Sequence, residues 1–396
     1  MNPNLGLLQP YPFQRLKELI ADIQPNADQA LIDLSIGEPK HSPPDFVLET
    51  LKKHLSGVVK YPPTPGSLNL RTAIAQWITD RFQLPLDTIT AQHHVLPVNG
   101  TREALFAIAQ CLFDSTSPDH HILMPNPFYQ IYEGAALLCG AKPWFYDSPA
   151  SNSYQPDFDS IQTSVWQQCQ MIYLCTPGNP SGAVVPQATL VKLLTLAEEH
   201  NFVIISDECY SEIYPDENNK PAGLLQAAAQ MGNTEYRRCL VFNSLSKRSN
   251  LPGLRSGFVA GDSELLKLFL LYRTYHGSAM PIHTDHASIA AWQDEAHVIQ
   301  NRQLYREKYT AVLDILGEPL KLKRPDAGFF LWPQLGRSDT EFTRELLNTQ
   351  NVKVLPGSYL SRSDGTKNPG DGQIRLALVA PVEQCTDACH RIVSCL

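Results

Sequence analysis

The sequence lacks any long run of apolar residues. None of its stretches approaches the roughly 20 apolar residues that a helix needs to cross a bilayer. Residues 1–16 contain no basic segment followed by an apolar run, which a secretory signal would have. We therefore expect no membrane partner and no export, and we predict a cytoplasmic protein.

Positive charge is also scarce. The chain has 32 Lys and Arg against 40 Asp and Glu, which gives a net charge of −8. Because affinity for nucleic acids rests largely on basic residues that meet the phosphate backbone, this balance predicts no nucleic-acid partner.

Cysteine pairs of the Cys-x-x-Cys type are absent, and the nine cysteines are odd in number. This pattern favours reduced, buried thiols over a disulfide framework. Cys385, Cys389 and His390 share a plausible helix face, but a cluster without a fourth ligand is weak evidence for a metal site. We therefore predict no metal.

The composition is that of a compact, globular protein. It is 43% hydrophobic and 18% charged, and 396 residues are enough for two lobes. Short apolar runs at 121–125, 171–176, 203–207 and 240–244 are typical of buried strands. Helical spacing lies between them, as at Leu105, Ile108 and Leu112. This alternation predicts a mostly parallel sheet covered by helices on both faces.

The pattern changes after about residue 276. A long helix is expected over 296–316, followed by strand-like runs at 329–332, 352–355 and 374–378. We predict a smaller α/β domain over 277–396, a large domain over 46–276, and an N-terminal segment over 1–45 that joins the small domain.

Polar residues at strand ends carry the chemistry, because open α/β sheets bind ligands beyond the carboxyl ends of their strands. Ser244-Leu245-Ser246-Lys247 ends one such run, and Arg255 follows in a glycine-rich turn. A lone lysine there is usually a solvated surface residue. Two hydroxyls and an arginine beside it, however, are phosphate ligands.

Three further motifs have both a plain and a functional interpretation. Gly100-Thr101-Arg102 opens a predicted helix, whose free N–H groups either receive an ordinary cap or bind a phosphate. Asp207 ends a buried strand, where it either caps a helix or pairs with a protonated ring nitrogen. Asn179, in Pro177-Gly178-Asn179-Pro180, either forms a turn or donates a hydrogen bond to a bound cofactor.

The joint order of Asn179, Asp207, Lys247 and Arg255 resembles the class I/II, fold-type I aminotransferases. The resemblance runs from Ser35-Ile36-Gly37-Glu38-Pro39 to Arg375, which is nearly the whole chain. It implies pyridoxal 5′-phosphate (PLP) as the cofactor, a seven-stranded, mostly parallel sheet in the large domain, and a homodimer with active sites at the subunit interface.

The resemblance also implies roles for individual residues. Lys247 would form the Schiff base with the cofactor and move the proton, Asp207 would pair with the pyridine nitrogen, and Tyr210 and Asn179 would bind the ring O3′. Arg375 would clamp the substrate α-carboxylate with help from the Gly37 backbone and Asn179, and Tyr129 would stack on the ring. The phosphate would be held by Gly100, Thr101, Arg102, Ser244, Ser246 and Arg255, and by Tyr61 of the neighbouring subunit.

Two segments of the sequence narrow the choice among aminotransferase reactions. Leu8-Gln9-Pro10-Tyr11-Pro12-Phe13 and Ser246-Lys247-Arg248-Ser249-Asn250 are similar to the proteobacterial succinyldiaminopimelate aminotransferases. That resemblance implies amino-group exchange between glutamate/2-oxoglutarate and N-succinyl-2-amino-6-oxopimelate in lysine and diaminopimelate biosynthesis. Such a substrate calls for further cations, and the candidates are Arg15, Lys17, Lys40, Arg248 and His276. Each of them is more typical of a plain surface charge, so none is assigned to the site.

Other activities remain open at this point. The runner-up is an aspartate, alanine or aromatic amino-acid aminotransferase of the same fold, and a PLP lyase or decarboxylase is also compatible with that fold. A non-enzymatic alternative is the aminotransferase-like ligand-sensing domain of a transcription regulator, although no DNA-binding module is expected ahead of Ile36.

Overall fold

A seven-stranded sheet forms the centre of the molecule in the computed structural model, which describes residues 1–26, 28–116, 120–363 and 365–396. The strand order is β2-β8-β7-β6-β5-β3-β4, and all neighbours are parallel except β8, which runs antiparallel to both β2 and β7. The strands are β2 (Val95–Val98), β3 (His121–Asn126), β4 (Lys142–Asp147), β5 (Cys169–Cys175), β6 (Val203–Asp207), β7 (Cys239–Ser244) and β8 (Gly257–Gly261).

Successive residues of the buried strands enter different cores. In β6, Ile204 belongs to one hydrophobic cluster and Ile205 to the other. The same alternation places Leu123 and Ile122 of β3 in opposite clusters. Because side chains alternate across a strand, a run that is apolar throughout needs cover on both faces.

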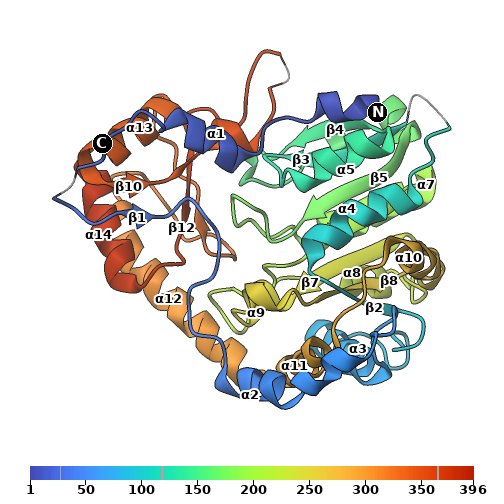
Figure 1. Cartoon of the computed structure of the whole chain (residues 1–396). Coiled ribbons are helices and arrows are strands. Elements are labelled where there is room, and N and C mark those ends of the chain that lie inside the picture. Colours follow the sequence, from blue (N-terminus) through green and yellow to red (C-terminus); the bar gives the residue numbers. More distant parts are fainter. Residues whose placement is uncertain (27, 117–119, 364) are drawn as a thin grey trace.

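Helices supply that cover (Figure 1). The cluster that contains Ile205 joins the sheet to α4 (Thr101–Leu112), α5 (Ile131–Cys139) and α10 (Ser263–His276). The cluster that contains Ile204 joins the sheet to α3 (Leu68–Phe82), α7 (Gln187–His200), α8 (Leu224–Gln230) and α11 (Ile282–Trp292).

The C-terminal part of the chain builds a smaller unit around its own core. Its antiparallel sheet has the order β11-β12-β9, with β9 (Phe330–Leu331), β11 (Leu355–Pro356) and β12 (Ile374–Ala377). A parallel pair joins β1 (Ile32–Asp33) to β10 (Val352–Lys353). The helices are α12 (Ala296–Leu316), α13 (Asp339–Gln350) and α14 (Val382–Val393).

The N-terminal segment links the two units. The short helix η1 (Pro3–Leu7) packs on α5, and α1 (Pro12–Leu19) packs on β11. In Figure 1 the chain crosses between them and later runs down from β1 to α2 (Asp45–Lys53). Segments far apart in sequence therefore lie side by side.

The predicted fold class is confirmed, and the helix predicted over 296–316 has those bounds. The domain boundaries stay a prediction. Since Ala287, Ala291 and Trp292 of α11 pack into the core of the large sheet, we propose that the large domain continues past residue 276, through α11.

The part of the chain described by the structure contains no helix long and apolar enough to cross a membrane. Within those same residues no group of three or more His, Cys, Asp or Glu is placed to hold a metal ion. Cys385 and Cys389 are buried in the core of the small unit, whereas His390 is exposed on the same helix. The three residues therefore do not form a common site.

Candidate active site

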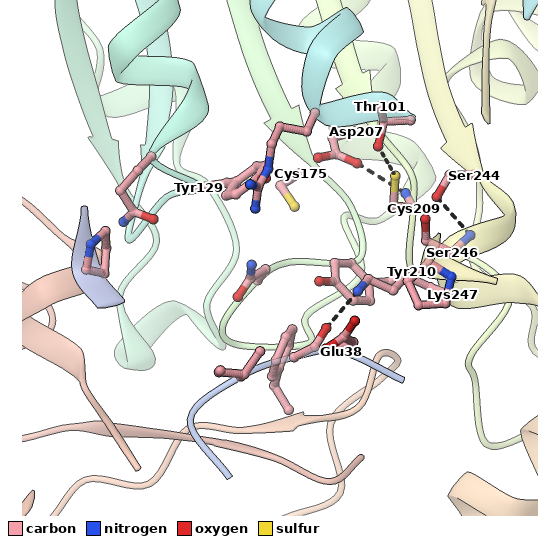
Figure 2. A pocket seen from close by; sticks show the side chains of 18 of the residues that line it. Glu38, Thr101, Tyr129, Cys175, Asp207, Cys209, Tyr210, Ser244, Ser246 and Lys247 are labelled. Carbon is pink, nitrogen blue, oxygen red and sulfur yellow. Dashed lines mark hydrogen bonds between the residues drawn. The ribbon is translucent and has the colours of Figure 1, made fainter. Parts of the chain in front are cut away.

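A cavity of about 520 Å³ lies beyond the carboxyl ends of β5, β6 and β7. This size suits a small organic ligand. Twelve of the predicted residues line it: Gly37, Thr101, Arg102, Tyr129, Asn179, Asp207, Tyr210, Ser244, Ser246, Lys247, Arg255 and Arg375. Figure 2 shows Ser244, Ser246 and Lys247 on one side of the cavity and Tyr129 on the other.

Lys247 reaches the cavity from α9 (Leu245–Arg248), the short helix that follows β7 without a gap. Its Nζ donates a 2.7 Å hydrogen bond to the Gly37 carbonyl. Burial, together with the positive charge of Arg375, lowers the pKa of Lys247 to about 8. A substantial fraction of this amine is therefore neutral near physiological pH, as a nucleophile requires.

An anion cradle lies next to Lys247. Gly100 has a φ of +86° at the start of α4, and a Cβ there would overlap the Arg255 guanidinium. No side chain caps this helix start, so its first N–H groups are free to bind a ligand. The Ser244 and Ser246 hydroxyls line the same cavity. This set of donors matches a phosphate dianion.

Asp207 is buried at the end of β6 and lines the cavity. Its Oδ1 accepts from the Cys209 backbone N–H at 3.2 Å, and its Oδ2 accepts from the Tyr132 hydroxyl at 2.7 Å. Burial raises the pKa of the Asp207 carboxyl, and these hydrogen bonds oppose that rise. The carboxylate is thus held in a fixed position, where it can pair with a cationic group.

Arg375 enters the cavity from β12, in the small unit. One terminal nitrogen donates to Asn179 Oδ1 at 3.0 Å, and the other donates to the Ser35 carbonyl at 2.8 Å. Its Nε is buried with no hydrogen-bond partner among the described residues. Burial lowers the pKa of Arg375 to about 10, so the guanidinium remains charged at neutral pH. The arginine is positioned to receive a carboxylate.

The Arg102 side chain contacts two tyrosines. Its Nε donates to the Tyr129 hydroxyl at 2.7 Å, and a terminal nitrogen donates to the Tyr11 hydroxyl at 3.5 Å. Tyr11 comes from the N-terminal segment, immediately before α1. The backbone N–H of Arg102 thus lies at the start of α4, whereas its guanidinium extends toward these two tyrosines.

Tyr61 is not brought into the cavity. Its side chain is fully exposed, on a loop between η2 (Leu55–Val59) and α3. Gly100 is not in the wall itself but backs onto Arg255.

The surface charges considered for a long substrate also lie outside the cavity wall. Arg248 is fully buried and bonds to the carbonyls of Ala291 and Asp294, and Arg15 stacks on the Tyr359 ring. Lys17, Lys40 and His276 are exposed residues.

Several residues of the site were not predicted. Tyr11, Phe13, Glu38, Gln130 and Cys209 line the cavity, and Tyr132 lies behind Asp207. Tyr132 had a weak signal in the sequence, since it is one helical turn beyond Tyr129 in a stretch that becomes α5.

The chemistry of this donor set fits PLP. The cradle suits its phosphate, Asp207 suits its pyridinium nitrogen, and Lys247 is a partly neutral amine next to both. Arg375 is a guanidinium in the cavity wall, where it would pair with a substrate carboxylate.

Comparison with known proteins agrees with this geometry. A sequence-family model described as "Aminotransferase class I and II" matches residues 29–392. Two curated relatives are the LL-diaminopimelate aminotransferases of Aquifex aeolicus, 31% identical, and of Maridesulfovibrio salexigens, 29% identical; in both pairs 98% of this chain aligns with 97% of the relative.

Solved structures give the same result. A Neisseria meningitidis aminotransferase is 48% identical over 100% of this chain and 99% of its own, with a TM-score of 0.95. A probable N-succinyldiaminopimelate aminotransferase from Thermus thermophilus is 25% identical over 97% of this chain and 100% of its own, with a TM-score of 0.85. The chain therefore belongs to the aminotransferase class I and II family, has the fold-type I architecture, and is a PLP-dependent aminotransferase.

Proposed function

We propose that this aminotransferase exchanges an amino group between glutamate/2-oxoglutarate and N-succinyl-2-amino-6-oxopimelate. The observation that carries the proposal is the Arg102 guanidinium in the cavity wall. Of the cations in the described part of that wall, Lys247 is assigned to the cofactor, Arg255 to its phosphate and Arg375 to the α-carboxylate. Arg102 is then left for a second anionic group of the substrate, which glutamate and the succinyl substrate both carry.

The chemical roles follow from position. PLP, when bound, supplies an electron sink for the pair of electrons released at the substrate α-carbon. Lys247 would hold the cofactor covalently and would serve as the base that takes and returns the substrate α-proton. Asp207 would pair with the pyridine nitrogen. Tyr210 and Asn179 would hold the ring O3′, and Tyr129 would cover the ring.

Substrate orientation depends on Arg375 and the segment around Gly37. A planar guanidinium binds a carboxylate through two parallel hydrogen bonds, which fixes the direction of the α-carbon. Because Arg375 lies on β12 and Lys247 on α9, the substrate bridges the small and large units. Their approach would exclude water from the reacting atoms.

A second candidate substrate is LL-diaminopimelate, because the relatives from Aquifex aeolicus and Maridesulfovibrio salexigens are named for it. Its distal carbon carries an ammonium as well as a carboxylate. Glu38, exposed in the cavity wall next to Gly37, is a carboxylate that would receive that ammonium.

We also propose a homodimer in which Tyr61 reaches the phosphate in the neighbouring subunit. Tyr61 and the nearby Val58 and Val59 are 101%, 68% and 79% exposed, an apolar group that a second subunit would cover. Sedimentation should give a dimer, and Tyr61→Phe should raise the dissociation constant of PLP. A fully active monomer would contradict both statements.

A half-reaction screen tests the substrate. The PLP-loaded enzyme is mixed with glutamate, N-succinyl-LL-diaminopimelate, LL-diaminopimelate, aspartate, alanine and phenylalanine, and loss of the cofactor absorbance is followed. We expect the highest kcat/KM for glutamate and the succinylated acid. A higher value for LL-diaminopimelate would support the second candidate, and a preference for alanine or phenylalanine would exclude both.

A further inference from the structure

The helix that carries Lys247 is one turn long, and its last carbonyl groups need hydrogen-bond donors from outside the helix. α9 contains only four residues, Leu245–Arg248. The last carbonyls of any helix have no partner within it. Here two of them, those of Lys247 and Arg248, accept hydrogen bonds of 3.2 and 3.3 Å from Nδ2 of Asn301 on α12. A side chain from another helix thus completes the turn that bears the lysine.

The other end of the Asn301 amide is equally engaged. Its Oδ1 accepts from Asn250 Nδ2 at 2.9 Å and lies 2.8 Å from His41 Nδ1. Backbone carbonyls only accept, which fixes the direction of the amide: Nδ2 faces α9 and Oδ1 faces the other two side chains. Asn301 is 3% exposed, so all its hydrogen bonds are made to protein groups among the described residues.

This arrangement determines the protonation of His41. Since Asn301 Oδ1 only accepts, His41 Nδ1 must carry a hydrogen. Its Nε2 is buried with no hydrogen-bond partner among the described residues, and its ring packs on Tyr305 at 4.6 Å. Burial, with the nearby charge of Lys308, lowers the pKa of His41. The burial and the unpartnered Nε2 both favour the neutral ring with its hydrogen on Nδ1.

His41 ends a segment that also contacts Lys247 directly. Gly37, four residues earlier, accepts the 2.7 Å bond from Lys247 Nζ, and Ser35 accepts from Arg375. The lysine turn and the substrate-binding segment are thus joined twice, through the lysine side chain on one side and through Asn301 and His41 on the other.

We infer that Asn301 is a positioning residue for Lys247, which acts by fixing the lysine backbone relative to the segment from Ser35 to His41. The inference rests on the proposed role of Lys247 as the cofactor-bearing base. A lysine that must reach both the cofactor and the substrate α-carbon from one backbone position tolerates little displacement, because a shift of about 1 Å can cost about a hundredfold in rate.

Two substitutions separate the two halves of the amide. Asn301→Leu keeps the approximate shape and removes all four hydrogen bonds. Asn301→Asp keeps the acceptor for Asn250 and His41 but places a carboxylate against the carbonyls of Lys247 and Arg248. Gln300→Ala is the matched control, since Gln300 is the exposed preceding residue on the same helix.

A second pair of variants tests the hydrogen bond between His41 and Asn301 without altering Asn301. His41→Asn keeps an N–H donor near the position of Nδ1, whereas His41→Leu removes it. If Asn301→Leu does not fold, this pair still decides the matter.

The readouts are steady-state kinetics with glutamate and a spectroscopic pH titration of the PLP-loaded protein, which reports the proton affinity of the nitrogen joining Lys247 to the cofactor. We expect Asn301→Leu and Asn301→Asp to lower kcat about ten- to hundredfold, to change the glutamate KM less than kcat, and to shift the titration midpoint. His41→Asn should restore the midpoint that His41→Leu displaces.

The inference is overturned if the titration midpoint and kcat of both Asn301 variants, or of His41→Leu where those variants do not fold, equal those of Gln300→Ala. It is also overturned if all variants lose only thermal stability. Lys247→Ala is measured alongside to distinguish failure of this inference from failure of the proposed role of Lys247. Normal turnover by Lys247→Ala would refute the role of Lys247, independently of the results for the Asn301 variants.

Discussion

The Tyr132 hydroxyl donates a 2.7 Å hydrogen bond to Oδ2 of Asp207, although the two residues belong to different elements, α5 and β6. Both are buried, and the Tyr132 ring stacks on Tyr173 with centroids 4.5 Å apart. The carboxylate assigned to the cofactor nitrogen is thus held by a phenol with little freedom to move.

Tyr132→Phe should therefore weaken the role of Asp207. Hydrogen bonds to charged groups contribute about 1.5–3 kcal/mol, so kcat should fall by about tenfold or more. Removal of the donor further raises a pKa that burial has already raised, so activity on the acid side should be lost at a higher pH than in the wild type. A pH profile of kcat measures this.

Tyr146→Phe is the control for that experiment. Tyr146 is also a buried phenol, but its hydroxyl donates to the Tyr173 carbonyl at 2.7 Å and not to Asp207. Its removal should leave the pH profile in place. If the two variants have the same profile, Tyr132 does not act through Asp207.

The apoenzyme should bind PLP covalently with a rate that depends on the neutral Lys247 amine. Because burial lowers the pKa of Lys247 to about 8, the rate should rise as pH increases through about 8 and level off above it. Arg375→Met removes a nearby positive charge, which should raise the midpoint. Stopped-flow absorbance measures both, and a rate that does not level off below pH 10 would contradict the assignment.

Arg375→Lys should raise the KM of every amino-acid substrate. Loss of a paired guanidinium–carboxylate contact costs about 2–5 kcal/mol, and an ammonium cannot make two parallel hydrogen bonds. Steady-state kinetics with glutamate and alanine test this. Equal KM values in variant and wild type would exclude Arg375 as the carboxylate clamp.

Arg102→Leu should discriminate between substrates. It removes the guanidinium beside Tyr11 and Tyr129 while the backbone N–H in the anion cradle remains. The KM of glutamate should rise about tenfold or more, as for loss of a charged hydrogen bond, and that of alanine should change little. A similar rise for both would place Arg102 on the cofactor phosphate.

Local patterns explain what could be predicted from the sequence. The buried strands and the helix over 296–316 follow from apolar periodicity, and strand ends identified Asp207 and Ser244 as ligand-facing. Lys247 and Arg375 were predicted from the order of the motifs along the chain, which does not depend on the three-dimensional structure.

Long-range packing accounts for what was missed. Asn301 contacts the Lys247 backbone only because tertiary packing brings this part of α12 to the end of α9, and nothing in the sequence around Asn301 indicates that contact. The Arg102 side chain is oriented by hydrogen bonds to Tyr129 and Tyr11, which are 27 and 91 residues away in the chain. The packing of α11 on the large sheet likewise arises from tertiary contacts and has no boundary signal.

The covalent attachment of PLP to Lys247 is the central proposed property of this site. Reduction of the PLP-loaded enzyme with borohydride fixes the attachment, and peptide mass mapping then locates it. We predict that the modified peptide contains Lys247 and that Lys247→Ala carries no label and does not turn over glutamate. A label on another lysine, or normal turnover by Lys247→Ala, would contradict the account.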